Sequence, residues 1–363
     1  MEEHLALVFG MYTNVRDAVR KQKTCIIDME QFYNVTTLPH DGIGAFLDRR
    51  SGDVATFRAE LSLGITDADS FVRLITNGGT AMDAIVIKQR PMFRHFDGRY
   101  SILDPRFLIE LASTTLYWTI FDQLDKKGRD LFSIFWGECF ERFALRELEF
   151  FYPATAQLLH LHVAITDGEI DALLDYVDFV IPIEIKSGLL AKDPKLMRDP
   201  DVLRPEIEKK FVAPKGVRQL TKAVRAIVAG EVHTLRPDCR VYPILVVDEP
   251  VLQCFAANRY MDERFQAEYP DRPVRVAPLT VMLIDELEEL LPYVASGAIG
   301  WREILDARVT TDGVIPDPFH TTLVSIRRAK DIAHQRNEFV SAEGVRIGKL
   351  IMEKYVMEKM KLT

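Results

Sequence analysis

The sequence has few cysteines and no long apolar run. Its four cysteines stand far apart among 363 residues and form no Cys-x-x-Cys pair, which argues against structural zinc and favours buried thiols in a reducing compartment. No window approaches the roughly 18 uninterrupted apolar residues of a membrane span. The first residues lack the positive charge of a signal peptide. We therefore expect a cytoplasmic protein without a membrane partner.

Nucleotide-binding motifs and an excess of positive charge are also missing. The chain contains no Walker loop and no Gly-x-Gly-x-x-Gly motif, so neither ATP nor a dinucleotide cofactor is indicated. Its formal net charge is −8. This balance argues against a uniformly basic surface that coats nucleic acid, but it leaves room for a local basic groove.

The composition is that of a globular protein. With 48% hydrophobic and 28% charged residues, the chain is long enough for one large or two modest domains. We expect an α/β fold whose core, residues 116–250, is a mixed central sheet flanked by helices. Residues 1–115 form an N-terminal α+β region without a chemical motif. Residues 251–363 form a mainly helical region packed on the core.

Local patterns predict several elements outside the central segment. Helices are expected at 5–21, 67–75, 105–120, 285–293 and 344–362. Strands are expected at 83–88, 91–94, 100–103, 240–247 and 278–284.

Aromatic and apolar residues recur at helical spacing from Asp130 to Phe150, which predicts a helix with a mostly buried stripe. The stripe consists of Phe132, Phe135, Trp136, Cys139, Phe140, Phe143 and Leu148. Core packing explains these residues. Glu138 and Glu141 are three residues apart and project from one flank of the helix. A glutamate on a helix usually faces solvent, so these two become candidate functional residues only because of the acidic residues in the segment that follows.

Three short strands are expected after this helix. The first, at 158–165, carries His160 and His162 on one face, but no other ligand clusters beside them, so we favour exposed or hydrogen-bonded histidines over a metal pair. The other two, at 169–174 and 179–185, are joined by a turn with Asp175 and Asp178 at its ends.

Antiparallel pairing of the last two strands places Asp171 opposite residues 182–184, depending on register, with about 5 Å between opposed Cβ atoms. Glu184 and Lys186 then share the face that Asp171 reaches, whereas Ile183 and Ile185 point into the core. Two facing carboxylates repel unless a cation lies between them, and Mg²⁺ suits them because it keeps waters and accepts phosphate oxygens. The lysine would activate water or offset phosphate charge. The alternative without a function is that Glu184, Ile185 and Lys186 belong to an edge strand whose polar face is exposed to solvent.

The order of helix Glu, strand Asp, strand Glu-x-Lys and helix Gln resembles the PD-(D/E)XK nuclease superfamily over roughly residues 130–250. The resemblance implies a restriction-endonuclease-like fold that hydrolyses phosphodiester bonds in DNA with Mg²⁺, for which Mn²⁺ can substitute. The matching catalytic positions are Glu141, Asp171, Glu184, Lys186 and Gln219. The metal would be held by Asp171, Glu184, Glu141 and the carbonyl of Ile185.

The match leaves some positions open. Ile170 stands where the superfamily's motif has proline. Glu138 is an alternative to Glu141, and Asp175 or Asp178 would replace Asp171 in a different hairpin register.

Basic residues outnumber acidic ones from 192 to 225. The pairs Asp193-Pro194, Asp199-Pro200 and Arg204-Pro205 predict a long loop before a helix that begins near Gly216. A solvated loop and contact with substrate phosphates are both open. The residues expected to contact nucleic acid are Lys209, Lys210, Lys215, Arg218 and Lys222.

The expected partner is DNA, and the family context adds a restriction or phage-defence system, a separate ATPase or sensor protein, and a second copy of the chain. The alternative is a catalytically inactive nucleic-acid-binding or assembly subunit that retains the fold, which the acidic net charge favours. An RNA nuclease is a third hypothesis.

Overall fold

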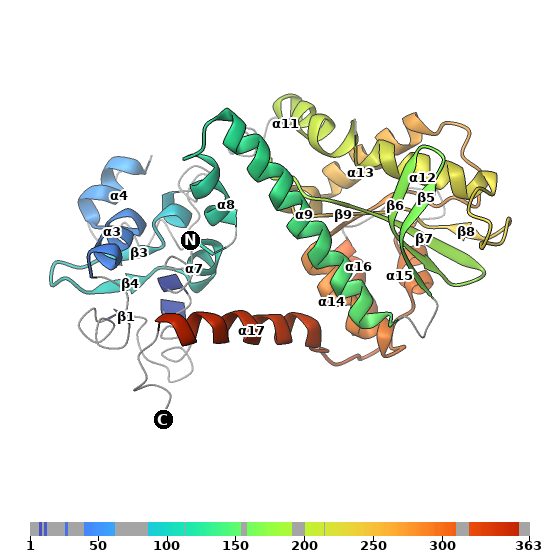
Figure 1. Ribbon diagram of the computed structural model, residues 1–363. Coiled ribbons are helices and arrows are strands. Elements are labelled where there is room, and N and C mark those ends of the chain that lie inside the picture. Colours follow the sequence, from blue (N-terminus) through green and yellow to red (C-terminus); the bar gives the residue numbers. More distant parts are fainter. Residues whose placement is uncertain are drawn as a thin grey trace. The chain divides into compact units, whose positions relative to one another are not determined.

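A computed structural model describes residues 7–8, 11–12, 26–27, 40–61, 86–112, 114–153, 158–190, 200–213, 215–309 and 319–355. The chain divides into two compact units: residues 1–129 with 343–363 form the first, and residues 130–342 form the second. The fold is mixed α/β, as expected from the sequence (Figure 1). No helix within the described ranges is long and apolar enough to cross a membrane.

The first unit contains a four-stranded sheet in the order β1-β4-β3-β2. Its strands are β1 (Ile26–Ile27), β2 (Ser51–Gly52), β3 (Met92–Arg94) and β4 (Tyr100–Ile102). Its helices are α3 (His40–Arg50), α4 (Val54–Glu60), α7 (Pro105–Glu110) and α8 (Thr114–Phe121). The predicted strands at 91–94 and 100–103 are confirmed as β3 and β4, and they pair antiparallel around the turn at Gly98.

Two predictions in this unit are wrong. The strand expected at 83–88 is helical where it is described, because Arg90 N–H bonds to the Val86 carbonyl at 2.9 Å, as in a helical turn. A short apolar run does not distinguish a strand from a buried helical turn. The single helix expected at 105–120 is divided into α7 and α8. The helix expected at 67–75 lies outside the described residues, and of 5–21 only 7–8 and 11–12 are described, as helical.

The second unit is built on a six-stranded sheet in the order β10-β9-β7-β6-β5, with β8 also beside β7. Its strands are β5 (Leu159–Ile165), β6 (Gly168–Asp175), β7 (Phe179–Lys186), β8 (Arg240–Val241), β9 (Ile244–Val247) and β10 (Thr280–Leu283). β5, β6 and β7 form an antiparallel meander, whereas β7, β9 and β10 are parallel. The sheet is therefore mixed, as predicted.

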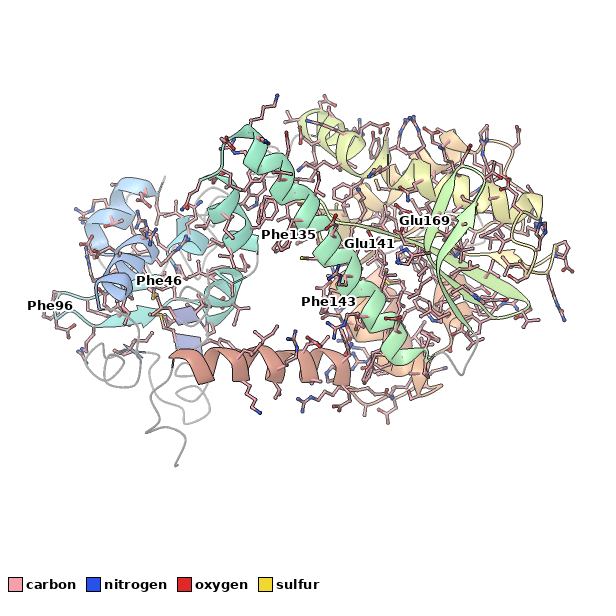
Figure 2. The ribbon with its side chains drawn as sticks, in the orientation of Figure 1. Phe46, Phe96, Phe135, Glu141, Phe143 and Glu169 are labelled. Carbon is pink, nitrogen blue, oxygen red and sulfur yellow. The ribbon has the colours of Figure 1, made fainter. Side chains whose placement is uncertain are left out.

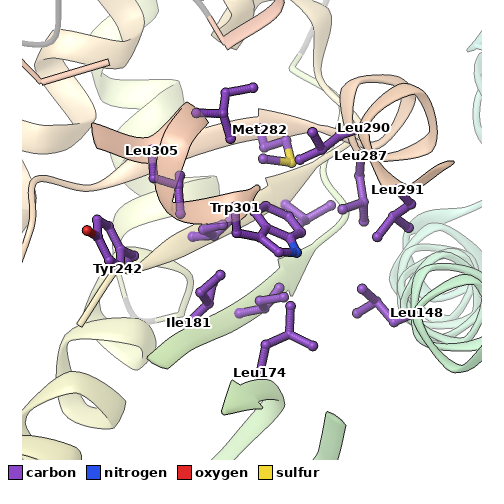
Figure 3. Close-up of a cluster of buried hydrophobic side chains, with 14 of the residues drawn as sticks. Leu148, Leu174, Ile181, Tyr242, Met282, Leu287, Leu290, Leu291, Trp301 and Leu305 are labelled. Carbon is purple, nitrogen blue, oxygen red and sulfur yellow. The ribbon is translucent and has the colours of Figure 1, made fainter. Parts of the chain in front are cut away.

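Helices cover both faces of this sheet (Figure 1). One face packs against α9 (Lys126–Phe151), α14 (Ile284–Ala295), α15 (Trp301–Ala307) and α16 (Phe319–Ala329) in a cluster that we call the Trp301 core. The other packs against α11 (Pro200–Ile207), α12 (Val217–Ala229) and α13 (Phe255–Glu268) in the Phe211 core. Figure 3 shows Trp301 near the middle of its core, with Leu148 and Leu174 around it.

Alternation along the strands feeds both cores. On β7, Ile181, Ile183 and Ile185 pack in the Trp301 core, whereas Val180 packs in the Phe211 core. Each fully buried isoleucine or leucine contributes about 2 kcal/mol of hydrophobic stabilisation. Because Ile183 and Ile185 point into the Trp301 core, the alternating residues Glu184 and Lys186 lie on the opposite face of β7.

The strand predicted at 240–247 is interrupted. β8 and β9 pair with β7 in one register, Val180 opposite Val241 and Ile183 opposite Ile244. The gap between them holds Pro182 on β7 and Pro243 opposite it. Neither proline has a backbone N–H to donate, so the hydrogen-bonded ladder stops there and resumes one residue later.

The long loop predicted before Gly216 is wrong for the described part of that segment. Residues 200–212 form α11 followed by one π-helical segment, Glu208–Val212, while 191–199 lie outside the described residues. Ile207, Phe211 and Val212 are buried in the Phe211 core. Burial of these apolar residues stabilises the helical structure. The prolines and charged residues of the segment led to the prediction of a loop instead.

The helix predicted at 130–150 is confirmed as α9, but its aromatic stripe is not mostly buried. Leu148 is fully buried, whereas Phe135 is 57% exposed and Cys139 is also exposed. Figure 2 labels Phe135 on α9. The core-facing residues of α9 are Ala144, Leu145 and Leu148, all in its second half. The C-terminal helix predicted at 344–362 is described only to its residue 355, as α17 (Glu338–Tyr355).

Candidate active site

The β6–β7 hairpin has the register that the site requires. Ala172 pairs with Ile183, so the next positions along the two strands, Asp171 and Glu184, lie level with each other. The turn is closed by the Val177 N–H, which donates to Asp175 Oδ1 at 2.8 Å. Asp175 therefore lies at the turn end of the hairpin. Of the alternatives left open by the sequence, Asp171 is the aspartate beside Glu184.

A backbone hydrogen bond fixes the Asp171 carboxylate. The N–H of Ile185 donates to Asp171 Oδ2 at 2.7 Å. Asp171 is 5% exposed and Glu184 is 4% exposed, although both are acids. Ile183 and Ile185 are buried in the Trp301 core, which confirms the predicted alternation along β7. Lys186, the last residue of β7, is half-buried.

The strands change their inward face at the row that holds Asp171. On β5, Leu161 packs in the Trp301 core but Val163 packs in the Phe211 core. Residues two apart share a face in a regular strand, so β5 turns over at His162, whose φ of 49° lies in the left-handed region. On β6, Ala172 and Ile170 differ in the same way. Asp171 is therefore placed where the sheet passes from one core to the other.

Burial and mutual repulsion shift the protonation of this pair. Burial raises the pKa of Asp171 to about 6, against the effect of the Ile185 N–H. Burial, followed by the charge of Asp171, raises the pKa of Glu184 to about 9. Burial and the nearby Lys215 lower the pKa of Lys186, and this effect outweighs the neighbouring acids. Both shifts on the acids favour neutral carboxyl groups until a cation compensates their charge.

Glu141 lies close enough to affect all three groups electrostatically. It lines a cavity of about 440 Å³ between α9 and β5, together with Glu138, Arg142 and His162. Figure 2 labels Glu141 on α9 and Glu169 on β6, and both carboxylates act on Asp171. Glu138 lines the same cavity but is not among the groups that shift Asp171 or Glu184. Glu141 is thus the better placed of the two helix acids.

The beginning of α12 contributes Lys215 to the site. Gly216 precedes the helix with φ of 71°, and a Cβ there would lie 2.1 Å from the carbonyl oxygen of Phe211. Only glycine fits this turn, which delivers Lys215 to the neighbourhood of Glu184 and Lys186. Gln219 is half-buried in the first turn of α12. No described residue forms a hydrogen bond with its side chain.

The other residues expected to contact nucleic acid differ in their surroundings. Lys209 and Lys222 are exposed. Arg218 forms an ion pair with Glu268 at 3.0 Å. Lys210 Nζ donates to the carbonyl of Leu189, so this lysine braces the segment after β7.

Two residues near the site were missed by sequence reasoning as functional candidates. His162 was considered and set aside, yet it lies level with Asp171 and lines the cavity. Asp248 was not considered. It directly follows β9 and accepts hydrogen bonds from Ser187 and Gly188, the two residues after Lys186. Its place at the carboxyl end of a buried strand was the available signal.

The donor set suits a hard cation held by few protein ligands. Within the ranges described, no three His, Cys, Asp or Glu side chains are close enough to hold a metal ion, so Glu141 does not complete a three-acid shell. Asp171 and Glu184 are level on adjacent strands, and the Ile185 carbonyl lies between Glu184 and Lys186 along the chain. Mg²⁺ is commonly bound by one or two carboxylates together with waters and substrate oxygens.

Comparisons of the chain with family models, with curated proteins and with solved structures found no match.

Proposed function

We propose that the protein is a metal-dependent nuclease that hydrolyses phosphodiester bonds in DNA. The observation that carries the proposal is the level placement of Asp171 and Glu184 on β6 and β7, with Lys186 at the end of the same strand. The cofactor is Mg²⁺, replaceable by Mn²⁺. Endonucleolytic cleavage within a restriction or phage-defence system is the setting that this chemistry suits.

The chain's residues divide the chemistry. A bound Mg²⁺ would neutralise charge on the phosphodiester and position water. Asp171 and Glu184 would hold it, with the Ile185 carbonyl as a third ligand. Lys186, whose pKa is lowered by burial, accepts the proton of the attacking water at Nζ. The water oxygen would bond to phosphorus as the bond to the leaving oxygen breaks, and the leaving oxygen would take a proton from solvent to become a hydroxyl group.

The surroundings supply contacts for the rest of the substrate. Lys215 is exposed beside the acids, and Lys209 and Lys222 are exposed on the same segment of chain. Phosphate contacts of this kind set the position of a nucleic acid without reading its sequence. They provide a local basic surface on a chain whose net charge is −8.

The test is cleavage of linear, supercoiled and branched DNA, and of RNA in parallel, by the purified protein with Mg²⁺ or Mn²⁺. Lys186→Ala is expected to lower the rate by about 100-fold or more, because the proton acceptor is lost. Lys330→Ala is the control, since this lysine pairs with Glu303 on the surface of the same unit. Equal cleavage by wild type and Lys186→Ala would refute the proposal.

A second candidate is a catalytically inactive nucleic-acid-binding or assembly subunit. The observation that favours it is the near-complete burial of both acids, with no third acidic ligand among the residues that the structure describes. Titration with Mg²⁺ and Mn²⁺ separates the candidates. An inactive subunit binds DNA without binding metal, and its stability is unaffected by either ion.

A further inference from the structure

Asp248 connects the two elements that carry the site. It follows Val247, the residue that pairs with Lys186 across β9 and β7. Its Oδ1 accepts the Gly188 N–H at 2.8 Å, and its Oδ2 accepts the Ser187 hydroxyl at 2.9 Å. Oδ2 also accepts the indole N–H of Trp136 on α9 at 3.2 Å. One carboxylate therefore holds the chain just after Lys186 and the helix that carries Glu141.

We propose that Asp248 is a positioning residue of the nuclease site, which fixes the carboxyl end of β7 against α9. This inference rests on the proposed function. Both oxygens of Asp248 are engaged, so the carboxylate cannot rotate without breaking at least one bond. The arrangement resembles the second layer of hydrogen bonds that holds reactive groups within about 0.5 Å of a productive geometry.

Lys186 needs such external support. Its ammonium group forms no ion pair or hydrogen bond with the described residues, so its place depends on the backbone from which it projects. The backbone after it is held at successive positions. Asp248 binds residues 187 and 188, and Glu249, which is fully buried, accepts the Leu190 N–H at 2.7 Å. Lys210 binds the Leu189 carbonyl between them.

Asp248→Asn tests the inference, because the amide preserves shape but replaces one acceptor oxygen with an NH₂ group, so either the Gly188 N–H or the Trp136 N–H loses its acceptor. We expect kcat for DNA cleavage to fall by about 10- to 100-fold, as for misplacement of a reacting group by about 1 Å. KM is expected to stay near the wild-type value. The limb of the pH profile that reports Lys186 is expected to shift. Trp136→Phe, which removes only the bond from α9, is expected to give a smaller fall.

Asp262→Asn is the matched control. Asp262 is also buried, and it joins α13 to the segment before β10 by accepting the Leu279 N–H at 2.8 Å, without a hydrogen bond to any residue of the proposed site. Its variant is expected to lose stability while kcat per folded molecule and the pH limb stay unchanged. If Asp248→Asn behaves in the same way, Asp248 is merely structural and the inference is overturned.

Amide hydrogen exchange provides a readout that does not need activity. In Asp248→Asn, exchange is expected to accelerate both in residues 130–141 of α9 and in residues 184–188, and in neither segment of Asp262→Asn. Unchanged exchange in either segment overturns the inference. A wild-type protein that cleaves no nucleic acid refutes the proposed function instead, and the exchange result alone then decides whether Asp248 fixes β7 against α9.

Discussion

Two pairs of acids in the second unit are equally hidden from solvent but differently bonded. Asp171 and Glu184 lie on the sheet, and Asp262 and Glu286 lie on α13 and α14. All four are between 3% and 6% exposed. Burial raises the pKa of every one of them. Their burial is therefore the same, and their hydrogen bonds make the difference.

The helical pair is satisfied by the protein. Asp262 accepts the Leu279 N–H at 2.8 Å and the Gln266 amide at 2.5 Å. Glu286 accepts the Leu283 N–H at 2.7 Å and a further N–H, from His320, at 2.9 Å. These carboxylates fix loops to helices.

The strand pair keeps most of its acceptor capacity. Asp171 receives one N–H, and Glu184 receives none from the described part of the chain. A carboxylate offers about four lone-pair sites. Burial without partners is costly for a charged group, so this pair is suited to a ligand that supplies positive charge. The comparison separates acids whose hydrogen bonds fix parts of the fold from acids that are proposed to bind a cation.

The largest expected effect is on cleavage. Asp171→Asn and Glu184→Gln each remove one charge from the proposed metal site and are expected to lower the rate by about 1,000-fold. Asp262→Asn and Glu286→Gln remove equally buried charges and are expected to retain the wild-type rate per folded molecule. Cleavage is measured on plasmid DNA with Mg²⁺. Equal losses in all four variants would erase the distinction between the pairs.

The next effect is on stability without metal. Folding raises the pKa of Asp171 from 3.8 to about 6 and that of Glu184 from 4.5 to about 9. The folded state therefore binds more protons than the unfolded state in this window, and its stability falls as pH rises. The loss between pH 4 and pH 9 is expected to be about 8 kcal/mol for the pair. Urea unfolding in EDTA measures it, and Glu184→Gln should have a flatter profile than wild type.

Metal binding should reverse that loss. Mg²⁺ or Mn²⁺ at 100 times its dissociation constant is expected to stabilise the wild type by about 2.7 kcal/mol. The midpoint of thermal unfolding should rise more at pH 8 than at pH 5, because the ion competes with protons for the two carboxylates. Asp171→Asn should show no increase, whereas Asp262→Asn should respond like wild type. A wild type that is insensitive to both ions would favour the inactive subunit.

The smallest effect is expected at Lys215. Lys215→Ala should weaken DNA binding and lower the slope of log affinity against log salt by about one phosphate contact. Removal of its charge should also raise the pKa of Lys186, since Lys215 lowers it in the wild type. Arg328→Ala, an exposed substitution on α16, is the control. Fluorescence anisotropy over a salt series measures both variants, and identical slopes would remove Lys215 from the binding surface.

The hairpin could be predicted from sequence because its signals are local. Two β-rich runs, a turn with two aspartates, and strict alternation along β7 determine the pairing and place Asp171 near Glu184. The exact register, and hence the choice among Asp171, Asp175 and Asp178, stayed open. The structure resolves it through pairings such as Ala172 with Ile183.

Features that depend on distant packing could not be predicted. The change of face at His162 requires two cores on opposite sides of one sheet. The helix at 200–207 contains Pro205, but burial of Ile207 in the Phe211 core stabilises it. Asp248 accepts hydrogen bonds from Trp136, 112 positions before it in the chain, and from Ser187, 61 positions before it. No local sequence pattern predicts a contact between residues so far apart in the chain.

The prolines at 182 and 243 divide the strand that carries Glu184 and Lys186 into two short ladders. The half before the break, with Phe179 and Val180, serves the hydrophobic interior. The half after it ends in the reactive groups. The break affects only this side of β7: the Tyr242 N–H still donates to the Val180 carbonyl at 2.9 Å, and on the other side the pairing with β6 continues through Pro182, opposite Leu173. The end of β7 that carries Glu184 and Lys186 is thus attached to β9 by a ladder of its own, from Ile183 opposite Ile244 to Lys186 opposite Val247.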